Sequence, residues 1–193
     1  FIAVKFYSGI ILTNDDVLSW YVKHFQAKRK FLFFPIIQKD QDFRLLLENA
    51  LPVSKILVDT YHLEGRQVLL FVGRLIDIKN LFFLLDALAL VVNRYPKVIL
   101  LFVGDGDQRV ALERHAERNG LADHVIFAGK KQGEDLYACY NVGQIFVLPS
   151  YYERFGAVVN EALLAGCYTL CSVVAGAACL IEPQKNGDLF DPA

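Results

Sequence analysis

The chain has 193 residues, with 20 basic and 21 acidic side chains and a formal net charge of −1. This balance gives no electrostatic footprint for an anionic surface, so we expect no nucleic-acid partner. The apolar runs are shorter than the roughly 18 residues that a membrane span needs. Four cysteines without a Cys-x-x-Cys pair predict buried free thiols in a reducing, cytoplasmic compartment.

Residues 1–62 predict a β-α-β arrangement with an irregular tail. The predicted elements are a strand at Ser8–Leu12, a helix from Asn14 or Asp15 to about Gln26, a strand in KFLFFPII, and a short helix near Asp42–Asn49. The stretch 38–63 is otherwise mixed in character. Because the chain starts at Phe1 and contains no Met, we expect it to be a fragment.

From Glu64 onward, short apolar runs alternate with helical patterns. The predicted strands are Val68–Val72, Val98–Val103, His124–Phe127, Gln144–Leu148 and Tyr168–Ser172. The predicted helices are about Asn80–Arg94, 107–119, Gly133–Tyr140 and 156–165. The pair Asn186-Gly187 predicts a turn before Asp188–Phe190. Five strands that alternate with helices indicate an α/β fold with a doubly wound, Rossmann-like parallel sheet.

Unusual polar side chains follow the predicted strands. They are Arg74 with Lys79, Asp105, Lys130 with Lys131, and Glu153. Ligands of open parallel sheets bind beyond the carboxyl ends of the strands, so we expect one shared site there. Ordinary polar surface loops are the alternative explanation. An NAD-binding domain fits poorly, because no Gly-x-Gly-x-x-Gly follows Val68–Val72.

The segment VGRLIDIKN places Arg74 and Lys79 in one strand-to-helix turn. The following helix offers unbonded N–H groups and the positive end of its dipole. Arg can hold phosphate oxygens with two hydrogen bonds, and Lys adds a point charge. The turn therefore predicts a diphosphate clamp, or alternatively an exposed loop with two solvated cations. The segment VGDG at 103–106 is only a weak signal, because a turn alone often needs Gly.

The segment PSYYERFGAVVNEALLAG places Glu153 and Glu161 eight residues apart. In one continuous helix they would lie about 12 Å apart along the axis, beyond the roughly 5–9.5 Å of a glycosidase acid pair. We therefore expect Glu153 in a loop and Glu161 in the second turn of a helix, where each holds different hydroxyls of an extended ligand. Gly156 would let backbone N–H groups approach that ligand. A solvent-facing Glu153 and a satisfied helical Glu161 are the alternative, although an unpaired charge among apolar neighbours is costly.

Taken together, these segments resemble the donor-binding half of retaining GT-B glycosyltransferases of family 4, the glycosyl transferases group 1 domain. The resemblance covers about residues 64–192 and includes FVGRLIDIKN, LLFVGDGDQ, FVLPSYYERFG, VVNEALLAG and NGDLFDP. Its most specific part is the Glu-x7-Glu spacing around Phe155-Gly156. It implies that 1–63 form the end of an N-terminal acceptor domain with an interdomain linker. Residues 64–193 would then form the C-terminal nucleotide-sugar-binding, Rossmann-like domain of a GT-B fold.

The resemblance implies retaining transfer of a sugar from a UDP-, GDP- or ADP-sugar to an unknown sugar or lipid-linked acceptor. Arg74 and Lys79 would hold the diphosphate and stabilise its growing charge, without a metal or another cofactor. Glu153 would bind hydroxyls of the donor sugar, and these three residues would carry the catalysis. The other expected donor contacts are Glu161 on the ribose, Gly129 and Lys130 near the base, and Gly73, Phe155, Gly156 and Ala157.

The chain departs from the family pattern in two places. The loop VVAGAACLIE carries Ala177 where the family usually has a second Gly, so this loop stays outside the expected site. Most of the acceptor domain is missing, so we expect little transfer by the chain alone and peripheral membrane contact only through that domain. A GT-B-shaped epimerase and a non-catalytic nucleotide-binding or interaction domain remain alternatives. Family frequency favours a role in polysaccharide or glycolipid synthesis.

Overall fold

The computed structural model describes residues 9–12, 19, 22–24, 30–33 and 39–193. Strands β1 (Gly9–Leu12) and β2 (Lys30–Phe33) pair in parallel and form a separate two-stranded sheet. They confirm, within the described residues, the two strands predicted near the start of the chain. The helix predicted to end near Gln26 lies largely outside the described residues.

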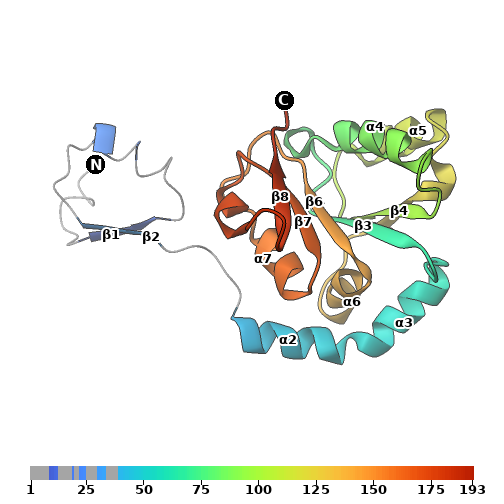
Figure 1. Cartoon of the computed structure of the whole chain (residues 1–193), viewed down its shortest axis with the longest axis horizontal. Coiled ribbons are helices and arrows are strands. Elements are labelled where there is room, and N and C mark those ends of the chain that lie inside the picture. The colour runs from blue at the N-terminus through green and yellow to red at the C-terminus, as the bar shows by residue number, and fades with distance from the viewer. Residues whose placement is uncertain (1–8, 13–18, 20–21, 25–29, 34–38) are drawn as a thin grey trace.

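A six-stranded parallel sheet organises the rest of the chain (Figure 1). Its strands, in chain order, are β3 (Gln67–Val72), β4 (Val98–Val103), β5 (Val125–Gly129), β6 (Ile145–Leu148), β7 (Tyr168–Ser172) and β8 (Gly187–Phe190). Their order across the sheet is β5-β4-β3-β6-β7-β8. The predicted α/β fold is therefore confirmed, and β8 joins the five predicted strands. The order reverses between β3 and β6, which makes their carboxyl ends a topological switch point.

Helices cover both faces of this sheet. They are α4 (Leu81–Val92), α5 (Arg109–Arg118), α6 (Glu134–Val142) and α7 (Ala157–Leu164), with short 3-10 helices η2 (Asp77–Lys79), η3 (Ala122–His124) and η4 (Gly176–Leu180). Right-handed crossovers place α4 and α5 on one face and α6 and α7 on the other, because the chain changes direction after β5. Every residue of β4, which lies between β5 and β3, is buried, as expected for a strand covered on both faces.

Two further helices, α2 (Asp40–Asn49) and α3 (Leu51–Thr60), precede the sheet and pack against α6. Asn141 of α6 donates hydrogen bonds from Nδ2 to the Leu47 carbonyl oxygen at 2.8 Å and to Ser54 Oγ at 3.0 Å. The short helix predicted near Asp42–Asn49 is confirmed as α2, whereas α3 was not predicted. Pro52 lies in the first turn of α3, where a helix needs no N–H donor.

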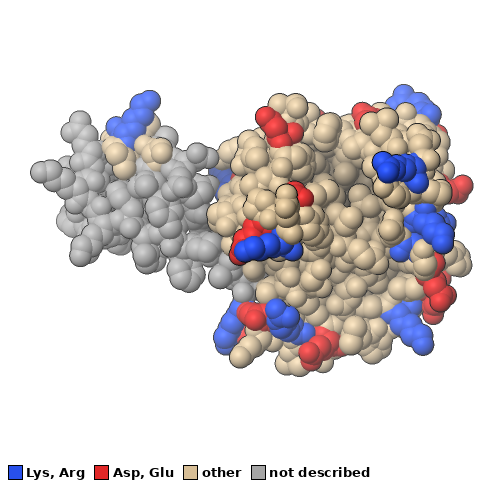
Figure 2. Space-filling view, viewed as in Figure 1, with Lys and Arg blue, Asp and Glu red and all other residues tan. Residues whose placement is uncertain are grey.

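An apolar groove of about 410 Å³ lies between α4 and the sheet. Leu69, Val147, Leu170 and Leu189 line it from four neighbouring strands. On the face drawn in Figure 2, Lys and Arg side chains of the described residues lie along the right-hand side, with Asp and Glu side chains among them. Among the described residues, no helix is long and apolar enough to cross a membrane.

Candidate functional site

Backbone hydrogen bonds join the loops that follow β3, β4 and β5. Gly73 N donates to the Val103 carbonyl oxygen at 3.0 Å, and Gly104 N donates to the Gly129 carbonyl oxygen at 2.9 Å. Gly104 has φ +143°, and a Cβ atom there would lie 1.8 Å from the Gly73 oxygen. Only Gly can therefore bring the β4 loop this close to the β3 loop. The three loops form one continuous edge.

A pocket of about 340 Å³ opens at this edge. Its lining residues are Val72, Gly73, Arg74, Val103, Gly104, Asp105, Lys130, Lys131 and Leu136. The three cationic side chains outnumber the one carboxylate. The Asp105 carboxylate is also bonded within its own loop, because its Oδ1 accepts a hydrogen bond from Gly106 N at 2.8 Å. The net positive charge suits an anionic ligand.

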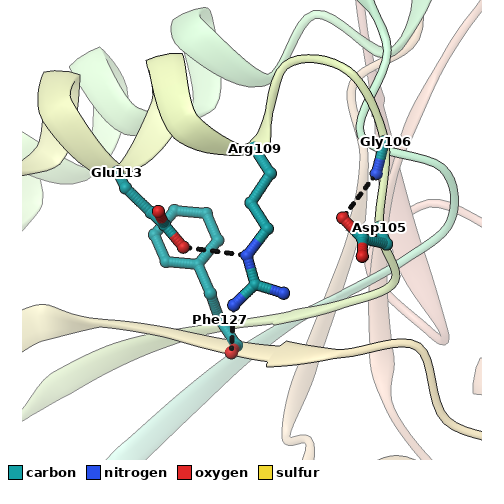
Figure 3. Close-up of polar contacts among 5 residues, drawn as sticks. All are labelled: Asp105, Gly106, Arg109, Glu113 and Phe127. Carbon is teal, nitrogen blue, oxygen red and sulfur yellow. Dashed lines mark hydrogen bonds and ion pairs between the residues drawn. The ribbon is translucent and has the colours of Figure 1, made fainter.

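Arg109, the first residue of α5, contacts β5 close to the point where that strand leads into the pocket residues Lys130 and Lys131 (Figure 3). Its Nε donates to Glu113 Oε1 at 2.8 Å, and its Nη2 lies 3.4 Å from the Phe127 carbonyl oxygen. The β4–β5 register shifts here, since Val103 pairs with Gly129 rather than with the residue next to Phe127. A bulge of this kind bends the strand and changes the direction in which its end points. Arg109 was not predicted as a site residue, because an Arg and a Glu four residues apart resemble an ordinary surface pair of a helix.

Lys79 and Glu153 form an ion pair at the switch point of the sheet. Lys79 ends η2 after β3, and Glu153 lies in the loop after β6, as expected. Their side chains are only 14% and 18% exposed. A backbone hydrogen bond from Tyr151 N to the Ile78 carbonyl oxygen, 3.0 Å long, holds the two loops together. The pair brings together two predicted site residues that lie 74 positions apart in the sequence.

The Phe155-Gly156 pair directs the chain from this loop into α7. Phe155 is buried, and its carbonyl oxygen accepts a hydrogen bond from Ala177 N at 2.7 Å. Gly156 has φ +89°, a conformation that favours Gly, and it lies where α7 begins. Ala157 is therefore the first helical residue, and the unbonded N–H groups of that turn lie close in sequence to Glu153.

Glu161 lies in the second turn of α7, where the sequence analysis placed it. Its Oε2 accepts a hydrogen bond of 2.7 Å from the hydroxyl of Tyr140, which α6 supplies. Burial, followed by the nearby charge of Glu161, raises the pKa of Tyr140 well above its usual value. Tyr140 was not predicted, because a Tyr within an apolar helix has the same pattern as a core residue.

The predicted residues thus form two groups along one edge of the sheet. The pocket is lined by Gly73, Arg74 and Lys130, with Gly129 immediately before Lys130. The ion pair of Lys79 and Glu153 lies beside Phe155, Gly156 and Ala157, and Glu161 follows one turn later. The residues that line the pocket do not include this second group. The proposed ligand contacts of both groups remain predictions.

The cysteines agree with the sequence analysis except at one position. Burial raises the pKa of three thiols to about 12, those of Cys139, Cys167 and Cys171. Cys179 is exposed, which corrects the expectation that all four are buried. The η4 segment places it at the surface after the buried Ala177. Within the described part of the chain, no three His, Cys, Asp or Glu side chains are grouped to hold a metal ion.

Comparisons with known proteins relate this architecture to one family. The chain matches the glycosyl transferases group 1 family over residues 55–193. An uncharacterized glycosyltransferase of Methanocaldococcus jannaschii is 34% identical over 124 residues, which are 64% of this chain and 32% of that protein. The alpha-D-kanosaminyltransferase of Streptomyces kanamyceticus is 30% identical over 134 residues, 69% of this chain and 35% of that protein. The chain thus spans about a third of the length of these relatives.

Solved structures share the fold. HepE of Anabaena, in complex with UDP, has a TM-score of 0.80 and 23% identity, over 98% of this chain and 51% of that chain. WaaG, a glycosyltransferase involved in lipopolysaccharide biosynthesis, has a TM-score of 0.78 and 24% identity, over 94% and 48%. The C-terminal domain of LpcC from Francisella tularensis has a TM-score of 0.60 and 22% identity, over 65% and 68%. The chain belongs to the glycosyl transferases group 1 family and corresponds to the C-terminal half of a GT-B fold.

Proposed function

We propose that the chain is the donor-binding half of a retaining glycosyltransferase that takes its sugar from a nucleotide diphosphate sugar. The observation that carries this proposal is the Lys79–Glu153 pair at the switch point. A cation suited to a diphosphate and a carboxylate suited to sugar hydroxyls lie side by side where parallel sheets bind ligands. Family membership and the UDP in the HepE structure support the same donor class.

The diphosphate would lie against Lys79 and Arg74, near the first turn of α7. As the bond between the anomeric carbon and the phosphate oxygen breaks, both electrons stay with the diphosphate. The two cations and the helix N–H groups stabilise this growing charge, a role that other enzymes assign to a metal ion. We therefore propose that transfer requires no metal. The acceptor hydroxyl oxygen would bond to the same face of the anomeric carbon, which retains its configuration, and the hydroxyl proton would pass to the departing phosphate oxygen.

Glu153 has a second role in this proposal. In this structure it neutralises Lys79 in a largely buried position, where an isolated charge is costly. A diphosphate that binds Lys79 replaces this partner, and Glu153 then accepts hydrogen bonds from hydroxyls of the sugar. In the donor complex, Lys79 would therefore contact the diphosphate leaving group and Glu153 would contact the sugar.

The remaining contacts follow the rest of the donor. Glu161 would accept hydrogen bonds from the ribose, and the pocket beside Gly129 and Lys130 would receive the base. The acceptor would be bound by the other half of the GT-B fold, which is also where peripheral membrane contact would occur. WaaG acts in lipopolysaccharide biosynthesis, which supports a polysaccharide or glycolipid acceptor. The unpaired cysteines support a cytoplasmic location.

Calorimetric titration of the whole protein with UDP, GDP, ADP and CMP tests the proposal. We expect one diphosphate to bind, with an affinity that EDTA leaves unchanged. Lys79→Gln should weaken it by about 10- to 100-fold, the value of a charge-assisted hydrogen bond. Lys97→Gln is the matched control, because Lys97 is exposed and precedes β4 at the opposite edge of the sheet. Binding of none of the four nucleotides, or equal losses in both variants, would overturn the proposal.

A further inference from the structure

Tyr140 connects the core of the domain to Glu161. The side chain is fully buried in α6, and its hydroxyl donates to Glu161 Oε2 at 2.7 Å. Glu161 itself lies on α7 and is only partly buried. The hydrogen bond therefore joins an internal, fixed group to a carboxylate at the margin of the core.

The ring of Tyr140 is held on two sides. Phe43 of α2 packs against it edge-on with centroids 6.2 Å apart, and Phe146 of β6 lies 6.5 Å away at a tilt of 38°. Close packing of this kind leaves a ring with one rotamer. The hydroxyl position is thus determined by α2, α6 and β6 together. By contrast, a Glu side chain with no such contact loses rotamer entropy when a ligand fixes it.

The hydrogen bond also has a fixed polarity. Because burial and the Glu161 carboxylate raise the pKa of Tyr140, its hydroxyl stays protonated throughout the physiological range. A carboxylate can only accept, so Tyr140 must be the donor. The hydrogen bond therefore restrains the Oε2 atom of Glu161.

We propose that Tyr140 is a positioning residue for donor binding, which orients the Glu161 carboxylate toward the ribose hydroxyls. The inference rests on the proposed function, because it assigns a support to the group that would hold the ribose. The competing explanation is a bond that only fastens α6 to α7. The two explanations differ in what they predict for ligands with and without ribose hydroxyls.

Tyr140→Phe removes the hydroxyl and keeps the ring. The whole protein is titrated with UDP and with 2′,3′-dideoxyuridine diphosphate, or with the matching pair for another base if that base is the one bound. We expect Tyr140→Phe to weaken UDP by about 3- to 10-fold and to leave the dideoxy ligand unchanged. Tyr137→Phe is the matched control: it loses the same hydroxyl from the same helix, and its ring also packs against Phe43. It should bind both ligands like the wild type.

A double-mutant cycle with Glu161→Ala completes the test. If Tyr140 acts through Glu161, Tyr140→Phe should cause no further loss of UDP affinity once Glu161 is Ala. Equal losses for UDP and the dideoxy ligand, or additive losses in the double variant, would reduce Tyr140 to a structural residue and leave the proposed function intact. If the wild-type protein binds no nucleotide, both the proposed function and the positioning role of Tyr140 are refuted. Circular dichroism and a melting curve confirm that each variant is folded.

Discussion

Gly104→Ala should destabilise the protein far more than an ordinary Gly-to-Ala substitution. The new Cβ would lie 1.8 Å from the Gly73 carbonyl oxygen, whereas real Cβ atoms essentially never approach closer than 3.0 Å. The two loops must therefore separate by about 1.2 Å, the difference between these distances. The obstacle is backbone, and no flexible side chain can move aside.

Two separate terms give the magnitude. Overpacking of a close contact costs about 1–3 kcal/mol. An Ala at φ +143° adds about 1–3 kcal/mol, because L residues rarely adopt this conformation. We therefore expect a loss of about 2–6 kcal/mol, a large part of the 5–15 kcal/mol that stabilises a typical domain. The displaced Gly73 and Arg74 should also weaken nucleotide binding.

Substitutions at two other glycines measure the backbone strain and the close contact separately. At Gly120, φ is +69° and no atom lies within 4 Å of the added Cβ, so Gly120→Ala measures backbone strain alone, about 1–2 kcal/mol. At Gly106, φ is not positive, but the Cβ would lie 2.3 Å from the Leu75 carbonyl oxygen, so Gly106→Ala measures the contact alone. Urea unfolding followed by far-UV circular dichroism provides the three free energies. A Gly104→Ala variant no less stable than Gly120→Ala would refute the reasoning.

Four further outcomes are expected. Arg74→Ala in the whole protein should lower kcat on the order of 100-fold and donor affinity much less, because the charge it meets grows in the transition state; a loss confined to KM would reject that role. Glu161→Ala should weaken nucleotide binding by about 1–3 kcal/mol, and unchanged affinity in calorimetry would remove it from the site. A thiol reagent at pH 8 should modify only Cys179 in the native protein. The free energy of unfolding should then fall between pH 9 and 12, because the unfolded chain ionises three thiols that the fold keeps protonated, those of Cys139, Cys167 and Cys171; a flat profile across this range would contradict the assignment.

The sheet was predictable because its strands are short, apolar and separated by turn residues. Val98–Val103 has no alternation, as a strand buried on both faces requires, and the structure gives it the same bounds. Strand β8 gives a weaker signal, since its four residues include Gly187 and Asp188. Helix α3 was missed for a different reason, because Pro52 reads as a break until its position in the first turn is known.

The sequence predicted which residue types lie at the carboxyl edge of the sheet, but it did not predict which of them contact one another. Strand ends placed Lys79 and Glu153 there, but their contact depends on β3 lying next to β6, and sequence spacing does not specify strand order. Arg109 and Tyr140 escaped notice for the same reason. Each acts through a partner on another element, Phe127 and Glu161 respectively. Long-range partners of this kind become visible only once the chain is folded.

The loops after β3, β4 and β5 are joined through main-chain atoms, and this has a consequence for how the charge of the pocket can change. The hydrogen bonds donated by Gly73 N and Gly104 N are both accepted by main-chain carbonyl oxygens. The only side-chain requirement is that residue 104 be Gly, because a Cβ atom there would clash with the Gly73 oxygen. The main-chain bonds that join the loops do not involve the side chain of Lys130, which lines the pocket. Replacement of Lys130 should therefore change the charge of the pocket while the three loops keep their shape. Such a framework separates the shape of this edge from the chemistry of the side chains that it displays.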